Sequence, residues 1–104
     1  MSWTETHRRW QALREIETLA NAGAEALPWN AEYADLFGHP DHLVAALRYR
    51  WKLTRDAQLD THLTEQALEE QRRRLVERHA GVLRLLRAYD GTVVVTAQPE
   101  PVPA

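Results

Sequence analysis

Apolar side chains recur every seven residues near the carboxyl end of the chain. Because a seven-residue spacing places side chains on one stripe of a helix, the pattern predicts a helix from about Thr64 to Asp90. Gly81 lies inside this predicted helix, where we expect it to permit a close helix approach or to mark a kink. Such a helix is about 40 Å long, and its apolar stripe needs another helix to cover it. The fold is therefore expected to be all-α. The residues of the stripe are Leu68, Leu75, His79, Val82, Leu86 and Tyr89.

The first predicted helix begins at a capping box. Ser2 and Glu5 have the S-x-x-E spacing in which each side chain caps the backbone of the other residue. The helical pattern continues to about Ala22, and Gly23 favours an end there because glycine readily adopts left-handed backbone angles. One face of this helix is apolar and the other is polar, which is typical of a helix that packs on a core.

Two further helices are predicted in the middle of the chain. Pro28 interrupts a connector at 24–30, and Asn30 can cap a short helix over 31–37. Pro40 suits the first position of a longer helix that ends near Gln58. We therefore predict a small helical bundle of two to three long helices and one short helix. Its predicted core comprises Trp10, Leu13, Ile16, Leu43, Leu47 and Trp51.

The segment after Gly91 does not continue the helical pattern. Residues 92–96 (Thr-Val-Val-Val-Thr) are β-branched throughout, which is typical of a strand. Since no other strand is predicted, we expect Val93–Val95 to pair with another copy, to join the sheet of another protein, or to stay loose. Gln98–Ala104 alternates proline and is expected to be extended. These patterns predict a helical domain at 1–91 and a loose tail at 92–104.

Composition narrows the classes of function. The sequence has no cysteine, which excludes disulfides, thiol catalysis and cysteine-ligated zinc. No apolar run approaches the roughly 20 residues of a membrane helix, and the first residues lack the pattern of a signal peptide. A cytoplasmic protein is therefore expected. The net charge of −2 disfavours nucleic-acid binding, because domains that bind nucleic acid are usually basic.

One short cluster has side chains that can bind a metal ion. His39, Asp41 and His42 place imidazole and carboxylate groups within a single helical turn. The spacing is weak evidence, since the Glu-x-x-His and His-Glu-x-x-His patterns of established helical metal sites are absent from the sequence. We favour the interpretation that His39 and Asp41 cap a helix and that His42 is exposed. No cofactor is predicted.

A second cluster alternates cations with aromatic rings over residues 48–55. Such a pattern can stack bases and contact phosphates. On a helix, however, Tyr49 and Trp51 point about 160° apart, so they do not form one platform. Arg50 is expected to pack its stem at the edge of the core and to pair with a carboxylate. A regulator that associates with nucleic acid is therefore the least favoured function.

The sequence favours an interaction protein over an enzyme. It contains no catalytic motif, and the last helix has more apolar surface than one neighbouring helix covers. We expect a non-enzymatic assembly protein that forms a homodimer through the stripe, or that binds a protein partner through the last helix or the tail. Alternatively, the apolar stripe of the last helix is covered within the chain and forms part of an internal core instead of a dimer interface. The second function considered is a small-molecule- or metal-binding helical protein, enzymes included, with a pocket lined by Trp10, Trp29, Trp51 and a histidine.

Overall fold

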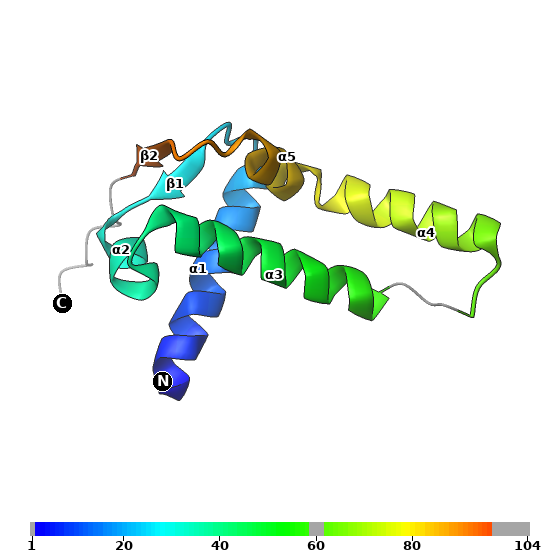
Figure 1. The fold of residues 1–104 in the computed structure, drawn as a ribbon, viewed down its shortest axis with the longest axis horizontal. Coiled ribbons are helices and arrows are strands. Elements are labelled where there is room, and N and C mark those ends of the chain that lie inside the picture. Colours follow the sequence, from blue (N-terminus) through cyan, green and yellow to red (C-terminus); the bar gives the residue numbers. More distant parts are fainter. Residues whose placement is uncertain (1, 59–61, 97–104) are drawn as a thin grey trace.

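The computed structural model describes residues 2–58 and 62–96 and shows a mostly helical chain with a small parallel sheet (Figure 1). The expectation of an all-α fold is confirmed as far as the chain is mostly helical. The small sheet was not predicted. No helix in the described ranges has both the length and the apolar character needed to cross a membrane. In chain order the elements are α1 (Trp3–Asn21), β1 (Leu27–Trp29), α2 (Ala31–Phe37), α3 (Pro40–Gln58), α4 (Glu65–Arg78), α5 (Ala80–Ala88) and β2 (Val93–Val95).

Local sequence determines where these helices begin. The side chains of Ser2, Asn30 and Thr64 each accept a hydrogen bond from the backbone amide three residues later, at 3.2, 2.8 and 3.2 Å. These bonds satisfy amide groups that the first turn of a helix leaves without an internal partner. Helix α3 instead starts with Pro40, whose missing N–H group is not needed at that position.

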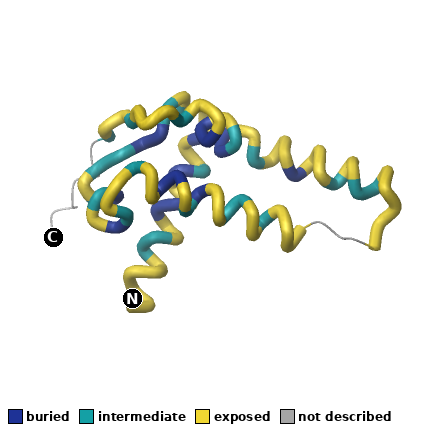
Figure 2. Tube along the Cα trace, viewed as in Figure 1, coloured by how far each residue is buried: buried dark blue, intermediate teal, exposed yellow. Residues whose placement is uncertain are grey.

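An apolar core joins α1, α2, α5, the two strands and the first half of α3, and we call these elements the body. Figure 2 shows most of the buried residues gathered there. Four predicted core residues, Leu13, Ile16, Leu43 and Leu47, lie in this core. The prediction for Trp10 is wrong, because its side chain is 46% exposed on the surface of α1. Trp51 is half-buried and lies outside the core cluster.

The helix predicted over 64–90 is two helices, α4 and α5, which meet at His79. His79 has backbone angles φ −112° and ψ 18°, which end α4, and Figure 1 shows that α5 takes a different direction. The physical reason is the close packing of α5 on α1. A Cβ atom at Gly81 would come within 2.5 Å of the backbone carbonyl of Ala20, so only glycine permits this approach. The approach places Val82 and Leu86 in the core of the body.

Strand β2 has a partner within its own chain, so the expectation that Val93–Val95 finds no such partner is wrong. β1 and β2 run parallel, with Leu27 opposite Val93 and Trp29 opposite Val95. Sequence reasoning missed β1 because Pro28 disfavours a strand, yet every strand of a two-stranded sheet is an edge, where proline is tolerated. The rest of the predicted tail, 97–104, lies outside the described residues.

Helix α4 extends from the body as an arm beside the end of α3 (Figure 1). Leu75 is its one buried residue. The arm is held near its carboxyl end, where Arg78 donates a hydrogen bond to the side-chain oxygen of Gln58 in α3 at 3.0 Å. The ring centres of Trp51 and His79 lie 5.3 Å apart at the same junction. Helix α4 therefore contributes little to the core.

Candidate binding groove

An apolar groove of ≈ 450 Å³ opens between α1 and α3, and the end of α2 contributes to its wall. Helix α1 lines it with Thr6, Arg9, Trp10 and Leu13, whose spacing places them on one stripe of the helix. Leu13 belongs to the core, whereas Trp10 is about half exposed. The α1 wall therefore runs from the core out to the solvent.

The second wall of the groove follows α3 from His42 to Leu53. Ala46 and Tyr49 lie between these two residues, and the spacing keeps all four on one face of the helix. Because a helix rises about 1.5 Å per residue, this wall is about 16 Å long. Tyr49 is 63% exposed and Leu53 is also exposed. The groove thus presents large apolar side chains to the solvent along two helices.

Arg50 joins the two walls. Its Nε donates a hydrogen bond to Oε2 of Glu17 in α1 at 2.8 Å, and its guanidinium carbon lies 4.6 Å from the centre of the Trp10 ring. Both members of the ion pair are partly buried, where the attraction between opposite charges is stronger than in water. The predicted pairing of Arg50 with a carboxylate is confirmed. The same contacts hold the Trp10 ring in place beside the groove.

Two polar side chains of the groove bind the end of α2. Nε of Arg9 donates a hydrogen bond to the carbonyl oxygen of Leu36 at 2.9 Å, and Nδ1 of His42 lies 3.0 Å from the carbonyl oxygen of Phe37. A carbonyl oxygen only accepts, so we assign the proton of His42 to Nδ1. The last carbonyl groups of a helix lack internal partners, and these bonds therefore fix α2 against α1 and α3.

The cluster considered as a metal site instead organises the start of α3. Nδ1 of His39 accepts a hydrogen bond from the amide of Asp41 at 3.0 Å, and the Asp41 carboxylate accepts one from the hydroxyl of Tyr89 at 2.5 Å. The bond to Asp41 raises the pKa of Tyr89 to about 12. In the part of the chain that the structure describes, no three His, Cys, Asp or Glu side chains are grouped to hold a metal ion. His42 belongs to the groove.

A polar contact on another side of α1 holds α2 in place. The hydroxyl of Tyr33 in α2 donates a hydrogen bond to Oε2 of Glu15 in α1 at 3.1 Å. Burial, together with the nearby carboxylate of Glu15, raises the pKa of Tyr33 to about 12. Such a tyrosine stays protonated at neutral pH, where it is a poor general base. The pair therefore has a structural role in joining two helices.

The structure divides the stripe that was predicted as a dimer interface. Leu75, Val82 and Leu86 are buried within one chain, so they form internal contacts, which is the alternative that the sequence left open. The other three members, Leu68, His79 and Tyr89, are half-buried and lie on α4, at the α4–α5 junction and after α5. The stripe does not form one exposed surface.

The tryptophans predicted to line one pocket are also separated. Trp10 lines the groove, Trp29 lies in β1, and Trp51 packs near the ring of His79. Tyr49 lines the groove while Trp51 does not, as their angular separation on a helix predicts. The groove therefore uses one of the three tryptophans and an aromatic residue from α3.

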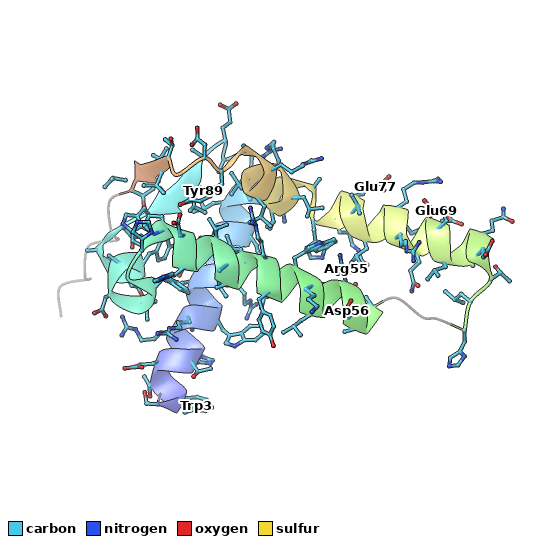
Figure 3. The ribbon with its side chains drawn as sticks, in the orientation of Figure 1. Trp3, Arg55, Asp56, Glu69, Glu77 and Tyr89 are labelled. Atoms are coloured by element: carbon cyan, nitrogen blue, oxygen red, sulfur yellow. The ribbon has the colours of Figure 1, made fainter. Side chains whose placement is uncertain are left out.

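Sequence reasoning missed the groove because its two main walls belong to helices that are far apart in the sequence. Tyr49 and Leu53 are four residues apart on α3, and Trp10 and Leu13 are three residues apart on α1. Trp3 does not line the groove: Figure 3 shows it at the amino end of α1, where its ring centre lies 5.0 Å from that of His7. The two spacings on α1 and α3 were the signal of the groove walls in the sequence. Only the packing of α1 against α3 shows which stripe is covered and which is open.

Comparison of the chain with family models, curated proteins and solved structures finds no match.

Proposed function

We propose that this protein is a non-enzymatic interaction protein whose groove binds the apolar face of a helix from a partner protein. The observation that carries the proposal is the row of exposed apolar side chains along the groove, Trp10, Tyr49 and Leu53. Burying such side chains against a partner removes apolar surface from water, which is the main driving force of protein association.

The composition of the groove favours a protein as its ligand. Trp, Tyr and Arg contribute most of the binding energy in protein interfaces, and the groove contains Trp10, Tyr49, Arg9 and Arg50. Arg50 is held by Glu17 and packs over the Trp10 ring before any partner arrives. A side chain that is already ordered loses less conformational freedom on binding, so the free energy of association is more favourable.

The shape of the groove favours a helix over an extended segment. The wall along α3 is about 16 Å long, which matches about 11 residues or three turns of a bound helix. Helices that dock in grooves contact them through apolar residues at positions i, i+3, i+4 and i+7. A partner helix with this pattern would cover Trp10 from one side and Tyr49 from the other.

A small apolar ligand is the second candidate. The groove volume of ≈ 450 Å³ lies within the range of about 300–1,000 Å³ that is usual for small-molecule sites. Such sites bury most of the ligand surface, however, whereas Tyr49 and Trp10 leave this groove open to solvent. The helix is therefore the primary proposal.

Site-specific crosslinking tests the proposal. A photo-crosslinking phenylalanine analogue placed at Tyr49 should capture a partner in cells that naturally express the protein, and the same analogue at Val76 on the α4 arm should not. Both side chains are exposed, so reactivity with solvent is matched. The captured protein is identified by mass spectrometry, purified, and titrated against the full chain by calorimetry.

Alanine variants then decide whether the groove is the binding surface. Tyr49→Ala and Leu53→Ala should each weaken binding of the purified partner by about tenfold or more, which corresponds to at least about 1.4 kcal/mol. Val76→Ala serves as the control and should bind as the wild type does. Unchanged affinity in both groove variants, or capture at both crosslinking positions alike, would show that the partner binds elsewhere.

A further inference from the structure

The two open edges of the β1–β2 sheet are not equivalent. In a strand, the N–H and C=O groups of one residue point to the same side, and those of the next residue point to the other side. The amide of Thr96 donates a hydrogen bond to the carbonyl of Trp29 at 2.8 Å, so both residues face the neighbouring strand. By this alternation, Pro28 faces the outer side of β1, and Val93 and Val95 face the outer side of β2.

The edge of β1 is closed to a further strand, whereas that of β2 is open. Pro28 has no N–H group to donate on the outer side of β1, and proline disfavours ladder formation there. Figure 1 shows β2 beside β1 at the surface of the body. Val93 and Val95 keep both their amide and carbonyl groups on this outer side, where the described residues place no third strand.

We infer that the open edge of β2 pairs antiparallel with the same edge of a second copy of this chain, around a two-fold axis at Val94. In this register Val93 lies opposite Val95 of the second copy, and Val95 lies opposite Val93 of it. Residues that face each other in this way exchange both of their N–H···O=C bonds. The two copies then share one continuous sheet in the order β1–β2–β2–β1.

The chemistry of β2 favours a second copy as the occupant of its edge. The edge is self-complementary, because the same donors and acceptors occur in the same order on both copies. Val94 is 52% exposed and Val95 is 78% exposed, and no charged residue of β2 would repel its equivalent across the axis. β-Branched side chains pair favourably between adjacent strands, so Val94 would pack on Val94 of the second copy.

The small size of the sheet supports the same inference. Two strands alone are marginally stable in water, and exposed edges are usually protected by lysine, proline or a bulge. The edge of β1 has such protection through Pro28, but β2 has none of these features. Pairing of two copies doubles the number of strands in the sheet and removes the unprotected edge from solvent.

Removal of one outward amide tests the inference in the full chain. Val95→Pro deletes an N–H group that faces away from β1, so the β1–β2 pairing should remain. Sedimentation equilibrium should show a wild-type dimer, and the variant should have a dissociation constant at least about tenfold higher. Val95→Thr is the matched control, since it keeps the amide and the β-branched shape, and it should dimerise as the wild type does.

A charge pair at the proposed axis provides the second test. Val94→Lys and Val94→Glu should each be monomeric, because like charges would meet across the axis, while circular dichroism should show unchanged helix content. An equimolar mixture of the two variants should form a heterodimer in native mass spectrometry.

Three results would overturn the proposal. The first is a wild type that stays monomeric up to about 0.5 mM, where the chain would bind itself with less than about 5 kcal/mol. The second is a Val95→Pro variant that dimerises normally, and the third is a mixture that gives no heterodimer. A dimer that is lost in Tyr49→Ala but kept in Val95→Pro would assign self-association to the groove instead.

Discussion

The body and the α4 arm contain neighbouring parts of one periodic sequence, yet their apolar side chains have different surroundings. Helix α5, in the body, buries Gly81, Val82, Leu85 and Leu86. Helix α4 is longer but buries only Leu75. The seven-residue repeat runs through both helices, so the repeat alone does not determine burial. What differs is the neighbour: α5 packs on α1 and α3, whereas α4 lies beside the end of α3.

The two regions are consequently stabilised by different interactions. In the body, the free energy of folding comes mainly from apolar side chains removed from water. In α4, local interactions carry more of it: Thr64 caps the first turn, and Arg74 pairs with Glu70 four residues earlier at 2.7 Å. Exposed pairs of this kind contribute about 0.5 kcal/mol or less each. We therefore expect the arm to open more readily than the body.

The largest expected effect is at the contact that separates the two regions. Gly81→Ala places a methyl group 2.5 Å from the backbone carbonyl of Ala20, and neither backbone can move without disturbing the core. The free energy of unfolding should fall by about 3 kcal/mol or more, as measured by urea denaturation.

A substitution at a second glycine, Gly23, distinguishes the cost of close packing from the cost of backbone strain. Gly23 has φ +110°, and a Cβ atom added to it would meet nothing within 4 Å, so Gly23→Ala should cost only about 1–2 kcal/mol. Equal losses in the Gly81 and Gly23 variants would contradict the close approach of α5 to α1. In that case the direction of α5 would need another cause.

The range of an interaction along the chain explains which elements the sequence predicts. The caps at Ser2, Asn30 and Thr64 involve residues three apart, so the sequence shows them directly, and the helix starts agree with the structure. The end of α4 at His79 depends on how Gly81 meets Ala20, about sixty residues earlier in the chain. Gly81 inside the helical pattern indicated a close approach or a kink, but the local sequence does not show that Ala20 is its neighbour. The repeat therefore predicted one continuous helix.

The same reasoning applies to the sheet and the groove. Pro28 disfavours a strand in the sequence alone. It is tolerated because Val93–Val95 pairs with one edge of β1 while Pro28 faces the opposite, unpaired edge. Trp10 shares an apolar face of α1 with Leu13, and only the position of α3 decides that Leu13 is covered and Trp10 is open. The residue types of the groove were visible in the sequence, but their assembly from three helices was not.

A pH-dependent contribution to stability is expected from the body, through Tyr33. Its pKa of about 12 in the folded chain lies above the usual 10, so folding favours the protonated hydroxyl. The contribution is therefore complete below about pH 10 and is lost as the pH rises through 12. At about pH 11 the loss should be on the order of 1 kcal/mol.

Urea denaturation at about pH 8 and pH 11 measures this loss. Tyr33→Phe should be less stable at the lower pH, because Glu15 loses its hydrogen bond, but it should depend less on pH. Hydrogen exchange in α4, which contains no tyrosine, should show no specific response to the substitution. A Tyr33→Phe variant that loses as much stability as the wild type would assign the alkaline transition to other groups, of which Tyr89 is the first to examine.

The smallest effect is expected at Val76 in the arm, and the same substitution at Val44 in the body provides the comparison. Val44 in α3 is 4% exposed and Val76 in α4 is 47% exposed, and both lie inside helices. Replacing either with alanine improves helix propensity by up to about 0.5 kcal/mol, so this gain cancels in the comparison. Val44→Ala also leaves space in the core and should cost about 1–2 kcal/mol net. Val76→Ala loses little packing and should stay within about 0.5 kcal/mol of the wild type in its free energy of unfolding.

Urea denaturation followed by circular dichroism measures the free energy of unfolding of both variants. A loss at Val76 as large as that at Val44 would mean that the outer face of α4 is covered in solution, and the arm would then have to be regarded as an interface.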